Sequence, residues 1–160
     1  MIVAIVFDRI LSSPAELAVL LGVVSVLHYI LAPPGARSIK PMAVTAVIAA
    51  LGFVLDARTR ELMCGGWLVM QVVGLADTAG RLAVWRVVRN QKPERPHMPR
   101  TPDELRAAAQ RFVGLAATTA IVGVLFNSAA FLTGSLFLLA TGIGWYRRSV
   151  QAQRKGHDGR

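Results

Sequence analysis

Long runs of apolar residues, separated by short clusters of charged or turn-forming residues, make up most of the chain. Five runs predict helices over residues 14–31, 41–55, 62–80, 112–126 and 129–146. A helix over the first run is about 27 Å long at about 1.5 Å per residue, close to a hydrocarbon thickness of about 30 Å. The pattern therefore predicts an all-α fold, a polytopic membrane helix bundle with about five transmembrane helices.

Helix-start and turn signals support these limits. Ser13-Pro14 with Glu16, and Thr101-Pro102 with Glu104, each have the arrangement of a capping box with proline in the first turn. The second of these helices begins before the apolar run at 112–126. Asn127-Ser128 predicts a tight reversal between the last two spans.

The same signals divide the chain into three parts. Residues 1–13 form an apolar N-terminal segment, and residues 14–148 form the transmembrane helical domain. The third span continues as a basic helix to about residue 90. The prolines of 91–100 then interrupt any helix, so 81–111 is expected to be a basic cytoplasmic loop. Residues 149–160 are a polar basic tail, expected to lack regular structure.

Charge gives the expected orientation. Only 17% of the residues are charged, against roughly 25% in soluble domains. If the loop after the first span is cytoplasmic, 15 of the 18 Lys and Arg residues lie inside, and only Arg9, Arg58 and Arg60 lie outside. The positive-inside rule then places the N-terminus outside and the C-terminus in the cytoplasm. The preference for Arg, Ala and Val is typical of a GC-rich bacterial or phage gene, so the expected location is the bacterial cytoplasmic (inner) membrane.

Polar residues at membrane depth are the first candidates for function. Asp77 lies roughly 22 Å and His28 roughly 21 Å from the outer ends of their spans. Arg81 is four residues after Asp77, which allows an ion pair near the inner surface. A His28–Asp77 pair would suit a proton relay, although a hydrogen-bonded histidine is the simpler interpretation. Gln71 is expected to hydrogen-bond across helices.

Two further sets of residues are candidates for contacts with the surroundings. The net charge is +9, and the basic residues flank the apolar spans, which favours anionic lipid headgroups over nucleic acid as partners. The candidate headgroup contacts are Arg86, Arg89, Lys92, Arg147 and Arg148. Small residues spaced four apart predict close helix packing. These are represented by Gly74, Gly80, Gly114, Gly134 and Gly144.

The sequence contains no recognisable set of catalytic, metal or cofactor residues. No nucleophile triad, phosphate-binding loop or metal-ligand cluster is present, and haem is poorly supported by the single intramembrane His28. The single cysteine, Cys64, excludes an intramolecular disulfide. No cofactor, no metal and no enzymatic activity are therefore expected.

Three hypotheses for function follow. The first is a non-catalytic membrane protein acting through helix–helix association, as an accessory subunit of a membrane complex or as a homo-oligomer. The second is a pore former of the phage-holin type, suggested by the short chain, the several spans and the basic tail. The third is a small proton-linked transporter subunit using His28 and Asp77.

Overall fold

The computed structural model describes residue 9 and residues 13–32, 39–89 and 101–158, with the backbone alone for 81, 82, 84–89 and 155–158. This part of the chain is helical and contains no strand. In chain order the elements are α2 (Pro14–Leu31), α3 (Lys40–Leu51), α4 (Ala57–Arg60), the π-helical turn η2 (Glu61–Gly65), α5 (Gly66–Arg89), α6 (Pro102–Leu125) and α7 (Ala129–Asp158). The predicted all-α class is confirmed.

Capping explains where the helices begin. Thr101 and Glu104 form the reciprocal capping box that starts α6, with hydrogen bonds of 3.1 and 3.3 Å. At α2 the Ser13 hydroxyl accepts a 3.4 Å bond from the Glu16 amide. Asp56 caps α4 in the same manner, and its hydrogen bonds from Thr59 hold the pKa of this exposed carboxyl below its usual value.

Four helical stretches in the described residues are long and apolar enough to cross a membrane: Pro14–Leu31, Ala57–Gly80, Pro102–Leu125 and Ala129–Arg154. The fifth expected span differs. Its helix, α3, has 12 residues, so its length of about 18 Å is well short of a bilayer core. Gly52–Leu55 continue it as hydrogen-bonded turns toward Asp56.

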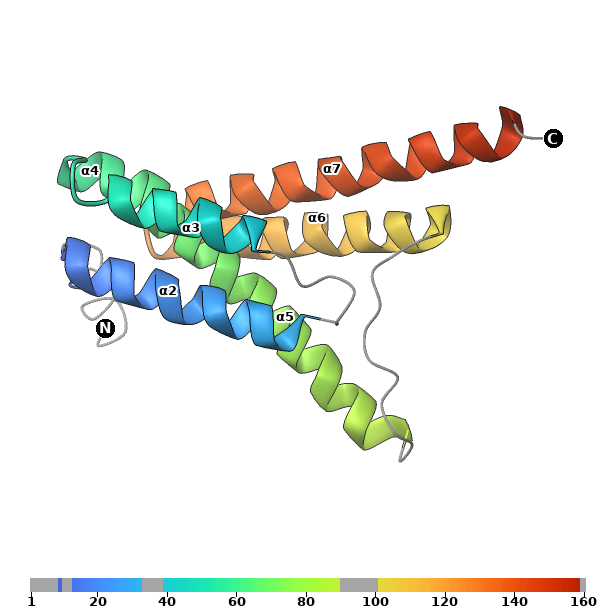
Figure 1. Ribbon diagram of the computed structural model, residues 1–160, viewed down its shortest axis with the longest axis horizontal. Coiled ribbons are helices and arrows are strands. Elements are labelled where there is room, and N and C mark those ends of the chain that lie inside the picture. The colour runs from blue at the N-terminus through green and yellow to red at the C-terminus, as the bar shows by residue number, and fades with distance from the viewer. Residues whose placement is uncertain (1–8, 10–12, 33–38, 90–100, 159–160) are drawn as a thin grey trace.

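The helices form two groups (Figure 1). The first is the antiparallel hairpin of α6 and α7. The second consists of α2 packed against α3 and α5. Helix α5 joins the groups, because it and η2 also pack against α7. A buried cluster that includes Leu17, Leu21, Cys64 and Leu68 lies where the groups meet.

The hairpin reverses through Phe126, Asn127 and Ser128. Asn127 has φ 48°, in the left-handed region that asparagine tolerates better than most residues. The Ser128 amide bonds to the Gly123 carbonyl at 3.0 Å, and the Asn127 amide bonds to the Val124 carbonyl at 3.2 Å. This is a Schellman ending, which satisfies the last carbonyls of α6 and turns the chain directly into α7. The tight reversal predicted at Asn127-Ser128 is present.

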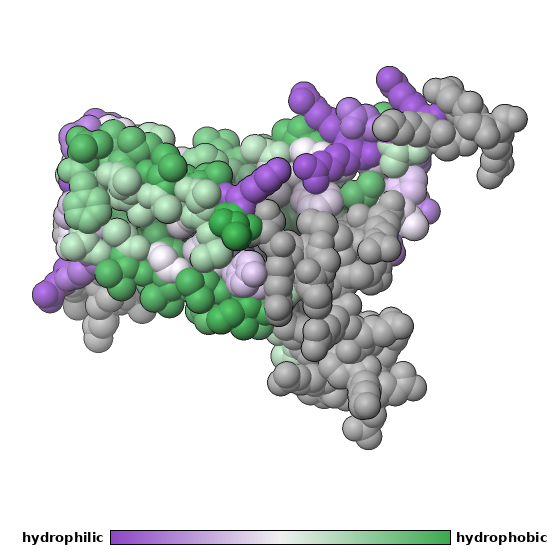
Figure 2. All heavy atoms as spheres, viewed as in Figure 1, coloured by the Kyte–Doolittle hydropathy of each residue, from purple (hydrophilic) through white to green (hydrophobic). Residues whose placement is uncertain are grey.

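The C-terminal segment is helical, which corrects the expectation of a tail without regular structure after residue 148. Helix α7 continues to Asp158, and α6 and α7 pack against each other. Ser149 is fully buried, and Arg106 donates a 3.2 Å hydrogen bond to Gln153. The first part of α6 and the last part of α7 thus stabilise each other. The pattern of neighbouring residues does not reveal such a contact, because the two segments are far apart in the sequence. Figure 2 shows an apolar region between polar side chains at the two ends of the molecule.

Candidate functional site

A chain of hydrogen bonds connects α2, α3 and α5, and Thr45 is at its centre. Thr45 is buried on α3, and its hydroxyl accepts bonds from the Gln71 amide (2.7 Å) and the Trp67 indole (3.2 Å) of α5. The same hydroxyl donates to the Pro41 carbonyl at 2.9 Å. One donor and two acceptor sites are all that a hydroxyl has, so Thr45 is saturated.

His28 extends this network to α2. Its Nε2 lies 2.8 Å from the backbone carbonyl oxygen of Gln71. A carbonyl only accepts, so Nε2 carries the proton and donates it. The ring lies over Gly74, where an added Cβ would be 3.4 Å from His28 Cε1. Gly74 therefore provides the space in which the imidazole reaches the α5 backbone.

This arrangement, named here the three-helix network (His28, Thr45, Trp67 and Gln71), fits a structural role. Each of its hydrogen bonds pairs a polar group with one on a neighbouring helix or on its own helix backbone. Interhelical hydrogen bonds of this kind hold membrane helices together. Within the described residues, no group of His, Cys, Asp and Glu side chains is arranged to hold a metal ion.

Asp77 is half-buried on α5, six residues after Gln71. The hydrogen bond of His28 Nε2 goes to the Gln71 carbonyl, and the His28–Asp77 pair considered for a proton relay stays a prediction. The side chain of Arg81 lies outside the described residues, and its ion pair with Asp77 stays a prediction.

The predicted headgroup contacts are described only in α7. Arg147 and Arg148 are exposed there, and the Arg148 guanidinium carbon lies 5.2 Å from the Trp145 ring centroid, in cation–π geometry. The side chains of Arg86, Arg89 and Lys92 lie outside the described part of the chain.

The five predicted packing glycines fall into two kinds. Gly134 lies at the crossing of α5 and α7, where an added Cβ would be 2.7 Å from Val69 Cγ1 and 3.0 Å from the Gly66 carbonyl oxygen. Gly74 accommodates His28. By contrast, an added Cβ at Gly80, Gly114 or Gly144 would meet no described atom within 4 Å. These three do not pack helices within the described chain.

Several important positions were not among the predicted residues. Thr45 is the only hydroxyl within 41–55, and Trp67 lies in the middle of an apolar run, so both were visible as unusual residues. Gly66, Gly123 and Gly142 also face close neighbours across helix contacts. Nothing in their spacing separates them from the other glycines, because Gly and Ala are frequent throughout.

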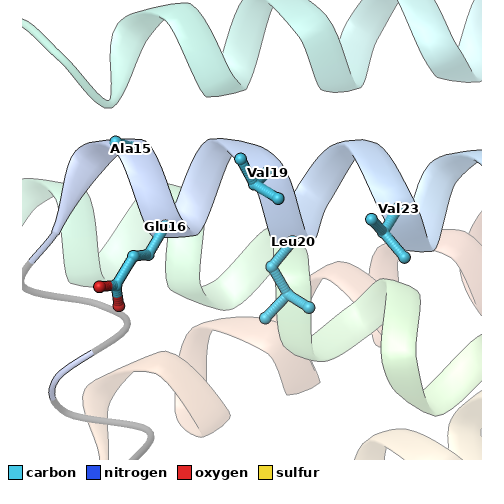
Figure 3. Close-up of a pocket in the computed structure, with 5 residues that line it drawn as sticks. All are labelled: Ala15, Glu16, Val19, Leu20 and Val23. Atoms are coloured by element: carbon cyan, nitrogen blue, oxygen red, sulfur yellow. The ribbon is translucent and has the colours of Figure 1, made fainter.

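A shallow hollow of 420 Å³ lies on α2, lined by Ala15, Glu16, Val19, Leu20 and Val23 (Figure 3). All five side chains come from one helix, and only Glu16 is charged. The hollow is part of an open helix surface and offers no converging polar groups to a ligand.

The described residues thus form an all-helical bundle with four helices able to cross a membrane, tied by an internal hydrogen-bond network. Comparisons with protein-family models, curated proteins and solved structures find no match to this chain.

Proposed function

We propose that this chain is a multi-pass protein of the bacterial cytoplasmic membrane that acts without catalysis, through association of its helices with other membrane helices. It does so as an accessory subunit of a membrane complex or as a homo-oligomer. The observation that carries the proposal is the small share of each span that the chain itself covers. In the apolar 18-residue stretch of each of the four spans, only 22% to 33% of the residues are buried inside the chain.

The uncovered faces contain small residues next to large apolar ones. On α6, Gly114 and Thr118 are exposed beside Val113 and Ile121. On α7, Ala140 and Gly144 are exposed in the same manner. The crossing at Gly134 demonstrates how this chain uses a small residue to bring two helices together. A second helix can approach Gly114 or Gly144 equally closely.

The positions of the helix ends fit the five proposed crossings, and the charge distribution makes the side of the C-terminus the cytoplasmic one in this proposal. In Figure 1 the end of α2, the start of α3, the end of α5, the start of α6 and the end of α7 point to one side. Helix α3 and the turns to Leu55 lead back to the other side, where α4 and the α6–α7 turn lie. In the proposed orientation, α3 crosses a locally thinned part of the bilayer.

The test is a change of Gly114 to Leu in tagged protein at native expression. A Cβ added at Gly114 would meet no described atom within 4 Å, so the fold of the single chain is retained while close approach of another helix is blocked. We expect the complex extracted in mild detergent to dissociate, as measured by its mass in solution. Val113→Leu, on the adjacent exposed position, is the matched control and keeps the complex. A wild-type chain that is extracted as a lone monomer contradicts the proposal.

A further inference from the structure

The α6–α7 hairpin extends past the length of a bilayer core. Helix α7 has 30 residues and is therefore about 45 Å long, against about 30 Å for the hydrocarbon layer. We name residues 102–111 of α6 and 145–158 of α7 the arm. Leu105, Ala108, Ala109 and Ser149 are buried there, so the arm is a packed pair of helices.

The exposed surface of the arm differs from that of the spans. Large apolar side chains such as Ile121, Val124 and Leu136 are exposed on the spans. On the arm Tyr146 is the one exposed large hydrophobic side chain among those described. Its other large exposed side chains are polar or charged: Asp103, Arg106, Gln110, Arg111, Arg147, Arg148, Gln151 and Arg154. The described side chains of the arm thus offer no apolar stripe to a third helix, and their positive charge favours an anionic partner.

Contacts across the hairpin show which residues lie at the base of the arm. An added Cβ on Gly142 would be 3.2 Å from both the Ala109 carbonyl oxygen and Phe112 Cβ. Arg111 on α6 is therefore level with Gly142 on α7, and Trp145 follows one turn later. Tryptophan is enriched at the membrane–water interface. Arg111 and Trp145 thus lie where the apolar region ends.

Arg111 and Arg148 lie on the same side of the hairpin. The hydrogen bond between Arg106 and Gln153 marks the opposite side. Arg111 follows Arg106 by five residues along α6, and Arg148 precedes Gln153 by five residues along α7. Because the helices are antiparallel, both steps lead from the arm toward the apolar region. At about 100° per residue, five residues turn each position by about 140° in the same sense. Both arginines therefore move to the face that carries Trp145, and the Arg148–Trp145 contact agrees with this placement.

The directions of the two helices bring these side chains to one level. Cα–Cβ bonds tilt toward the N-terminus of their helix. Helix α7 leaves the apolar region at Trp145, so Arg148 leans back toward it. Helix α6 runs the other way, so Arg111 leans out of the apolar region toward the arm. Both guanidinium groups are thereby directed to the layer around the Trp145 ring.

We propose that Arg111 and Arg148, on either side of Trp145, form a binding site for the phosphate headgroup of an anionic phospholipid. The site rests on the membrane placement given above. Guanidinium groups bind phosphate through paired hydrogen bonds. Trp145 holds Arg148 by its cation–π contact at the depth where lipid phosphates lie.

The experiment uses the full-length chain in mild detergent, titrated with phosphatidylglycerol, phosphatidylcholine or inorganic phosphate, with bound lipid measured by native mass spectrometry. We expect phosphatidylglycerol to bind at least tenfold more tightly than phosphatidylcholine (order of magnitude). Inorganic phosphate is expected not to displace it. Arg111→Gln with Arg148→Gln lowers the affinity about 25-fold, on the order of fivefold for each arginine at a membrane surface.

The matched control is Arg106→Gln with Arg154→Gln, which removes the same charge from the outer part of the arm and leaves the affinity within about threefold. Should the first double variant fail to fold, Arg111→Gln alone is used, with an expected loss of about fivefold. The proposal is overturned by equal affinity for the two lipids, by displacement with inorganic phosphate, or by an equal loss in the control. Failure of the membrane placement itself has a different signature, which is recovery of the chain from the aqueous fraction without detergent.

Discussion

The two helix groups of this bundle are held together in different ways. In the three-helix network, side chains of α2, α3 and α5 hydrogen-bond across the helices, with Thr45 saturated at the centre. In the hairpin of α6 and α7, glycines allow close approach at Gly123 and Gly142, and Gly134 does the same where α7 joins α5 of the other group. In lipid, neither method depends on the hydrophobic effect, which does not drive one apolar helix toward another. The comparison shows that a single chain uses direct polar bonds among α2, α3 and α5, and backbone proximity where α7 packs on α6 and α5.

The largest expected effect is at the close crossing of α5 and α7. Gly134→Val places carbon atoms against Val69 and the Gly66 carbonyl, and overpacking of this kind destabilises by about 3 kcal/mol. The free energy of unfolding, measured by titration with a denaturing detergent and followed by circular dichroism, gives the change. Gly22→Val is the control, because an added Cβ there meets nothing within 4 Å. If the two variants are equally stable, proximity at Gly134 does not hold α5 to α7.

A smaller loss is expected in the polar group. Thr45→Val keeps the shape of the side chain but leaves the Gln71 amide and the Trp67 indole without their acceptor. Orphaned buried donors make this change cost about 2 kcal/mol in the same unfolding measurement. Thr118→Val is the matched control, since the exposed Thr118 hydroxyl bonds only to its own helix at Gly114. A Thr45→Val protein as stable as its control means that the network contributes no net stability.

The smallest of the three effects tests the start of the hairpin. Thr101→Ala removes one half of the reciprocal capping box of α6 and is expected to cost about 1 kcal/mol. Ser13→Ala, at the start of α2, removes a single longer bond of 3.4 Å and is expected to cost less. The difference in unfolding free energy between the two variants measures how much the arm depends on its cap. The reverse order would show that this end of α6 is held by packing alone.

Much of the fold follows from local signals in the sequence. The limits of α2 coincide with the predicted span 14–31, since Ser13 and Pro14 begin the helix and Pro33 follows its end. The reversal at Asn127 and the capping box at Thr101 are equally local. The sequence does not predict the helical tail, because the tail depends on contacts with the start of α6 such as the hydrogen bond from Arg106 to Gln153, 47 residues apart in the sequence.

The sequence indicates which residue types are candidates for the site, but it indicates their hydrogen-bond partners less well. His28 and Gln71 stood out as polar residues in apolar helices, and the structure joins them to each other through the Gln71 backbone. Depth alone suggested the pair of His28 and Asp77, and since depth says nothing of which helix faces meet, that pair stays a prediction. For the glycines, spacing of four identified Gly134 but did not distinguish it from Gly80, Gly114 and Gly144, which have open space around them.

The buried thiol of Cys64 has a practical consequence. It is the only cysteine of the chain and lies 3.3 Å from the Ile48 carbonyl oxygen, between η2 and α3. A maleimide reaches this sulfur only when α3 separates from η2. The rate of alkylation of the protein, with no engineered label, therefore reports how often the contact between α3 and η2 opens.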